Sequence, residues 1–188
     1  MRMLRRLALG ALLLVTAVPT ASAQNKTVNE EFTAILTNIS NVGGTGLTPV
    51  TIRLTRWTPD DANEKLLGTL REDGQDAFLR ALLNQKSVGS IATPTSLRYD
   101  FFYAREAVED GSRRIILISD RPMQMWERMG ASPSREYPFT VIELRLDKDG
   151  NGSGTLAQMV QLKLVGNFLG IENLATSPMR LGEVKKVK

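Results

Sequence analysis

The chain contains neither histidine nor cysteine among its 188 residues. Without histidine it cannot build a Ser-His-Asp triad, a His-ligated zinc site or a histidine acid–base pair. Without cysteine it cannot form disulfides, thiolate metal sites or thiol nucleophiles, nor carry the lipid-modified cysteine of a lipoprotein. Any general acid or base must therefore be Asp, Glu, Lys or Tyr. These absences favour a protein that is not an enzyme and has no cofactor.

A concentrated basic stripe, which is typical of nucleic-acid binding, is also missing. The formal net charge is +4, but three of the positive charges are arginines within the first six residues. The remaining basic cluster is a short tail at residues 185–188. No long apolar run follows residue 23. We therefore expect no nucleic-acid partner and no transmembrane segment after the N-terminal region.

The first residues resemble a secretory signal peptide. An arginine-rich start is followed by the apolar region Leu7 to Val18, which is too short to span a bilayer, and by the small residues Ala21-Ser22-Ala23. We expect residues 1–23 to be a signal peptide and residues 24–188 to form a single domain. The mature protein, starting at Gln24, should be soluble and either periplasmic or secreted.

Period-two alternation of apolar and polar residues predicts strands along most of the mature chain. The predicted strands lie at 31–40, 50–57, 97–106, 115–118, 139–146, 155–164, 168–174 and 179–184. After the second strand, Thr58-Pro59-Asp60-Asp61 is typical of a helix start with Thr58 as the cap, and Asp73-Gly74 separates this helix from a second. The expected fold class is α+β: an antiparallel, meander-like sheet with an inserted helical hairpin. Such a sheet either stays open beneath the helices or curls into a partial barrel.

Four segments occur in a fixed order, and with them the chain resembles a group of uncharacterised exported bacterial proteins. The segments are Thr51-Ile-Arg-Leu-Thr-Arg-Trp57, Tyr99-Asp-Phe-Phe-Tyr-Ala-Arg105, Ser119-Asp-Arg-Pro-Met123 and Tyr137-Pro-Phe-Thr-Val-Ile-Glu-Leu144. The resemblance covers most of the mature chain. It implies export and a single domain, and it implies no catalytic residue.

The segment from Asp147 to Gly154 resembles the first half of a calcium-binding loop. Its candidate ligands are Asp147, Asp149, Asn151 and Ser153. The position of the closing bidentate glutamate holds Gln158, and the flanking residues alternate as strands rather than as helices. We therefore expect a solvated hairpin turn and no metal site.

Aromatic and methionine side chains are the candidate ligand-binding residues. Trp57 and Tyr99 could line an apolar pocket, and Met123 and Trp126, in an expected short helix, could cover it. The alternative is that the aromatic residues form ordinary core, as we expect for Phe101 and Tyr103. If they line a pocket, at least one ring should be partly exposed.

Charged residues within the predicted sheet offer two further sites. Asp100, Asp120 and Glu143 could supply a general acid and base, and the arginines from 105 to 128 form either an anion site or a solvated rim. The leading hypothesis is an exported non-enzymatic binding or interaction domain for a small apolar molecule or a protein partner. The alternative is a carboxylate-based hydrolase acting on glycans or the cell wall. Pocket geometry separates the two hypotheses.

Overall fold

Strands make up most of the chain in the computed structural model, which describes residues 27–38, 46–95, 98–120, 137–165, 168–173 and 178–188. The strands are β1 (Thr27–Asn38), β2 (Gly46–Arg56), β3 (Gly89–Ala92), β4 (Tyr99–Phe101), β5 (Tyr103–Glu109), β6 (Ser112–Ser119), β7 (Phe139–Leu146), β8 (Asn151–Val165), β9 (Phe168–Asn173) and β10 (Met179–Lys186). Helices α1 (Asp60–Asp73) and α2 (Gln75–Leu83) follow β2, as expected. The described chain is mainly β, so the expected α+β class holds only roughly. The expected signal peptide and the expected helix from Met123 lie outside the described residues.

The strands form one antiparallel sheet in the order β4-β3-β2-β1-β10-β8-β7-β6-β5, with β9 paired to β8 beside this path. The last two strands, predicted at 168–174 and 179–184, do not pair with each other. Each pairs instead with a different half of the long strand β8, β10 with residues 151–156 and β9 with residues 160–165. The halves meet near Met159, whose φ of 51° is unusual for a side-chain-bearing residue and marks an irregularity in the strand.

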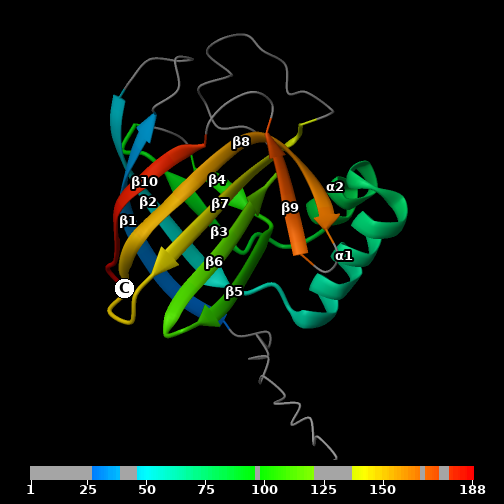
Figure 1. Ribbon diagram of the computed structural model, residues 1–188, viewed down its shortest axis with the longest axis horizontal. Helices are drawn as coiled ribbons and strands as arrows, with labels where there is room; N and C mark the ends of the chain where they lie inside the picture. The colour runs from blue at the N-terminus through cyan, green and yellow to red at the C-terminus, as the bar shows by residue number, and fades with distance from the viewer. Residues whose placement is uncertain (1–26, 39–45, 96–97, 121–136, 166–167, 174–177) are drawn as a thin grey trace, which may run out of the picture.

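The two ends of this strand order are joined by the chain itself, because only Phe102 separates β4 from β5. On one side, the Val88 amide donates to the Phe101 carbonyl at 2.8 Å. On the other, the Phe102 amide donates to the Ile118 carbonyl at 3.0 Å. Within two residues, the chain stops pairing with β3 and begins to pair with β6. The sheet curls into a nearly closed barrel, with the helices outside it (Figure 1).

The corner at Phe102 also reverses which face each side chain occupies. Tyr99 and Phe101 belong to the apolar cluster inside the barrel, Tyr103 packs outside, and Ala104 is inside again. Unbroken alternation along 97–106, which the sequence predicts as one strand, would put Tyr99 and Tyr103 on one face, and this prediction is wrong beyond Phe101. Phe102 and Tyr103 both lie on the outer side, as two successive residues do at a β-bulge.

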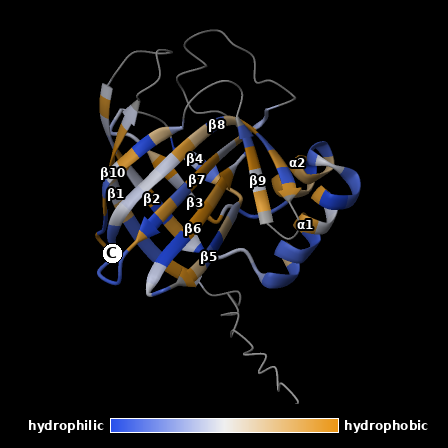
Figure 2. Cartoon of the chain, in the orientation of Figure 1, coloured by the Kyte–Doolittle hydropathy of each residue, from blue (hydrophilic) through white to orange (hydrophobic). Residues whose placement is uncertain are grey.

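Two apolar clusters result from this arrangement. The interior cluster collects inward side chains from strands all around the barrel and from Trp57 and Val88. The outer cluster lies where α1, α2 and the second half of β8 cover the outer face of β6 and β7. There the rings of Phe78 and Phe139 meet edge to face, 5.6 Å between centroids. Figure 2 shows that hydrophilic residues predominate along α1, while hydrophobic residues recur along the strands.

Polar contacts fix the start of α1 to β5. Thr58 does not cap the helix, because Pro59 holds the capping position and makes no side-chain bond. The Thr58 hydroxyl instead accepts the Ala104 amide at 2.9 Å, and Arg105 donates to the Asp60 carboxylate at 2.6 Å. One turn into the helix, the Tyr103 hydroxyl donates to Asn63 Oδ1 at 2.7 Å, and burial raises the pKa of Tyr103 to about 12.

Two glycines provide a test of this geometry. A Cβ at Gly89, where β3 begins, would overlap the Arg53 carbonyl of β2, whereas a Cβ at Gly68 in α1 would meet nothing within 4 Å. Gly89→Ala should destabilise the protein by about 1–3 kcal/mol through overpacking. Gly68→Ala should stabilise it by about 1 kcal/mol, because alanine favours the helix. Thermal denaturation of both variants measures the difference, and equal melting temperatures would contradict the close approach of β2 and β3.

Candidate functional site

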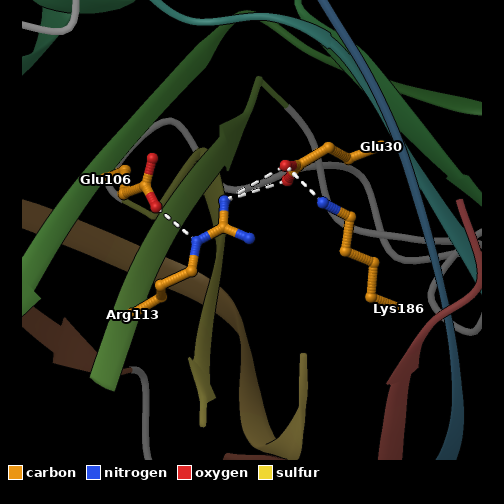
Figure 3. Close-up of polar contacts among 4 residues, drawn as sticks. All are labelled: Glu30, Glu106, Arg113 and Lys186. Atoms are coloured by element: carbon orange, nitrogen blue, oxygen red, sulfur yellow. Dashed lines mark hydrogen bonds and ion pairs between the residues drawn. The ribbon is translucent and has the colours of Figure 1, made fainter. Parts of the chain in front are cut away.

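Four charged side chains converge at the end of the barrel where β1 begins and β10 ends. We call Glu30, Glu106, Arg113 and Lys186 the mouth cluster (Figure 3). Each residue lies two positions along its strand from a side chain of the interior cluster, namely Phe32, Ala104, Ile115 and Val184 respectively. Alternation therefore points all four toward the barrel axis, just beyond the apolar interior.

The mouth cluster is a chain of charges of alternating sign. Arg113 Nη2 donates to Glu30 Oε2 at 3.0 Å and to Oε1 at 3.3 Å, while its Nε pairs with Glu106. Lys186 Nζ donates to Glu30 Oε1 at 2.8 Å. Two carboxylates thus balance two cations. The cluster has no net charge with which to attract a charged ligand.

The contact between Glu30 and Arg113 crosses the mouth. β1 and β6 are separated by β10, β8 and β7 in the strand order, so this ion pair joins nearly opposite walls of the barrel. Burial alone would raise the pKa of Glu30. Hydrogen bonds from Lys186 and Arg113 outweigh that effect and hold the pKa below its ordinary value. The carboxylate therefore stays ionised at neutral pH and is poorly suited to act as a general acid.

A second charged group lies on the outer face of β6 and β7. Glu143 accepts from Arg114 Nε at 3.0 Å and from Arg145 Nε at 2.7 Å. Burial would raise the pKa of Glu143, but the hydrogen bonds from both arginines lower it overall. This carboxylate, a candidate in the hydrolase hypothesis, is therefore also held in its ionised form.

The other two candidate carboxylates lie at the opposite end of the barrel from the mouth cluster. Asp100 is on β4, opposite Ser90 of β3, and Asp120 directly follows β6. Both are half-buried, and the Ser119 hydroxyl lies 3.5 Å from Asp120 Oδ1. β4 begins and β6 ends at this same end, so the fold brings both carboxylates to one end of the barrel.

The aromatic candidates lie in the barrel interior. Trp57 is 4% exposed and Tyr99 is 6% exposed, and both belong to the interior cluster together with fully buried Phe101. Tyr103 is buried as expected, but in the outer cluster. None of these four rings is exposed enough to form the wall of an open pocket. Met123 and Trp126 lie outside the described residues.

The calcium-like segment forms the β7–β8 hairpin. Asp147 Oδ1 accepts the amides of Asp149 and Asn151, both at 2.9 Å, and Gly150 supplies a φ of 80°. Asn151 and Ser153 already belong to β8. The Asp147 carboxylate therefore binds its own backbone, as in an Asx turn. Within the described residues, no group of three or more Asp or Glu side chains is arranged to hold a metal ion.

Sequence reasoning missed the mouth cluster. It grouped Arg113 with the other arginines from 105 to 128 as an anion site or a solvated rim, and it singled out neither Glu30 nor Glu106. The available signal was the alternation itself, since Arg113 is in phase with Ile115 and Leu117. Only the closure of the barrel, however, brings Glu30 opposite Arg113.

Comparison of the chain with protein-family models, curated proteins and solved structures finds no match. No helix in the described part of the chain is long and apolar enough to cross a membrane.

Removing the charge of Glu30 tests the mouth cluster. Glu30→Gln should destabilise the protein at pH 7 by about 1–3 kcal/mol, because charge-assisted hydrogen bonds from both Arg113 and Lys186 are lost. Folding lowers the pKa of Glu30. Its contribution to the free energy of unfolding is therefore complete when the pH is above the ordinary glutamate pKa, and it disappears as the pH falls through the lowered pKa of the folded protein. The variant and the wild type should therefore converge in acid.

The adjacent residue supplies the control. Glu31 pairs with Arg53, whose side chain is 51% exposed, so Glu31→Gln should cost only about 0–1 kcal/mol at pH 7. Urea unfolding between pH 2 and pH 8 measures both variants. An equal cost for the two substitutions would show that the ion pair across the mouth contributes no more than a surface pair.

Proposed function

We propose that the protein is an exported, non-enzymatic domain that binds a protein partner through the outer wall of its barrel. The observation that carries this proposal is the burial of the aromatic rings that could have lined a pocket. Trp57 and Tyr99 are 4% and 6% exposed, and both pack in the interior cluster with Phe101, which is 0% exposed. A drug-sized ligand requires a cavity of several hundred Å³, about 300–1,000. The packing therefore favours a protein partner over a small apolar ligand.

The state of the carboxylates weighs against the hydrolase alternative. Glu30, Glu106 and Glu143 all form ion pairs with arginines, and the pKa values of Glu30 and Glu143 are lowered rather than raised. A general acid needs a raised pKa to stay protonated at neutral pH. Asp100 and Asp120 are the carboxylates that keep this alternative open, because they share one end of the barrel.

Export is part of the proposal and has its own test. The pattern Ala21-Ser22-Ala23 after an apolar region predicts cleavage after Ala23. N-terminal sequencing of the protein recovered from the periplasm or the medium should begin at Gln24. Recovery of a membrane-bound form that retains residues 1–23 would contradict export as a free domain.

The binding mode can be tested with a photo-crosslinking amino acid at exposed wall positions on three strands. Thr55, Ala107 and Thr155 are suitable, lying on β2, β5 and β8. Crosslinking in the exporting cell should give a discrete protein adduct at one or more of these positions. The proposal fails if no position gives an adduct.

The same preparation tests the two alternatives. We expect no saturable binding of the apolar dye N-phenyl-1-naphthylamine and no release of soluble fragments from labelled peptidoglycan. One-to-one dye binding that Trp57→Ala abolishes would support an apolar ligand instead. Fragment release that Asp100→Asn and Asp120→Asn both abolish would support the hydrolase.

A further inference from the structure

The helices leave part of the outer wall uncovered, and two arginines stand side by side there. Arg114 of β6 and Arg145 of β7 are direct partners in the strand register. Their side chains are 44% and 71% exposed, whereas the Glu143 side chain between them is only 19% exposed. The carboxylate is therefore more shielded from water than either of the two arginine side chains that bind it.

Two like charges opposite each other on adjacent antiparallel strands destabilise a sheet. Glu143 compensates for this repulsion, but one carboxylate balances only one of the two arginines. Arg145 is largely exposed, and an exposed ion pair stabilises a fold by little. Arg145 therefore adds little to the stability of the fold, and folding alone does not account for an arginine at this position.

Hydroxyl groups extend the same surface. Ser153 of β8 lies opposite Arg145 in the register, and Thr155 lies opposite Glu143. Both are exposed. Two guanidinium groups and two hydroxyl groups thus present hydrogen-bond donors on adjacent strands. We call Arg114, Arg145, Ser153 and Thr155 the arginine face.

We propose that the arginine face binds carboxylate side chains of an acidic segment in the partner protein. Arginine presents paired N–H donors whose geometry matches a carboxylate, and both arginines already bind one carboxylate here through Nε. Arg145 contacts Glu143 through Nε at 2.7 Å, and its side chain as a whole is 71% exposed. This inference rests on the proposed function and names the binding surface and the chemistry of its partner.

A fluorescein-labelled hexaglutamate peptide serves as the probe, with fluorescence anisotropy as the measurement. The double variant Arg114→Gln/Arg145→Gln should bind it about tenfold more weakly than the wild type, and binding should weaken as salt rises. Arg53→Gln is the matched control, because the Arg53 side chain on β2 is similarly exposed and is paired with its own carboxylate, Glu31 of β1. This variant should bind like the wild type. Melting curves confirm that each variant is folded.

Several outcomes would overturn the inference. These are no binding of hexaglutamate by the wild type, equal loss of binding in Arg53→Gln, or equal binding of a hexalysine peptide. Preferential binding of inorganic phosphate or of phosphatidylglycerol vesicles, again lost in the double variant, would also reject an acidic protein segment as the partner. Crosslinking at Thr55 with none at Thr155 would leave the proposed function standing and reject the arginine face. Absence of crosslinks at every wall position would reject both.

Discussion

At Phe102 the chain changes its hydrogen-bonding partner from β3 to β6, and this corner determines most of the architecture. Two backbone hydrogen bonds define it, from Val88 to the Phe101 carbonyl and from Phe102 to the Ile118 carbonyl. Without this corner, β4 and β5 would be the two free edges of an open sheet. With it, the edges are joined, one face becomes an interior and the other becomes an outer wall. The reversal of side-chain direction then follows, and it places Ala104 and Glu106 inside the barrel and Tyr103 outside.

Closure of the barrel explains why the charged groups at its mouth are shielded and fully paired, whereas those on its outer wall are exposed to water. In the mouth cluster, Glu30 and Arg113 come from nearly opposite walls and are largely shielded from water, so each needs partners to offset the cost of burial. The alternating chain from Glu106 to Lys186 supplies those partners. On the outer wall, water solvates Arg145 directly and no such requirement exists. The inner charges are therefore accounted for by the fold, whereas the second outer arginine is not.

The local elements could be predicted from the sequence, because they depend on neighbouring residues. Alternation located nearly all of the described strands, and Asp73-Gly74 marked the boundary between the helices, where Gly74 has a φ of 80°. The tight turn at Asp110-Gly111 is likewise formed by residues with positive φ. The short strand β3 was missed, since four residues with a leading glycine give little periodicity. Its place between β2 and β4 depends on contacts with strands distant in sequence.

What the sequence could not provide is the set of contacts between strands far apart in the chain. Glu30 and Arg113 are 83 residues apart, and nothing near either residue indicates the other. The same limit applies to Trp57, which the sequence offered as a candidate to line an apolar pocket. In the folded chain, the following residue, Thr58, bonds to Ala104 and holds the end of β2 against β5. Trp57 itself packs in the apolar interior and is 4% exposed.

The distribution of polarity supports placing the proposed binding surface on the outer wall. Among the described residues, apolar side chains pack in the interior, and the balanced charges of the mouth cluster lie at one end of it. The helices cover the outer face of the sheet only where the outer apolar cluster requires it. Beyond that cluster, Arg114 and Arg145 remain in contact with solvent around a carboxylate that neutralises only one of them. The proposed binding surface follows from this excess of positive charge, because the strand register already places the two arginines together and little backbone reorganisation is needed for them to meet an opposite charge.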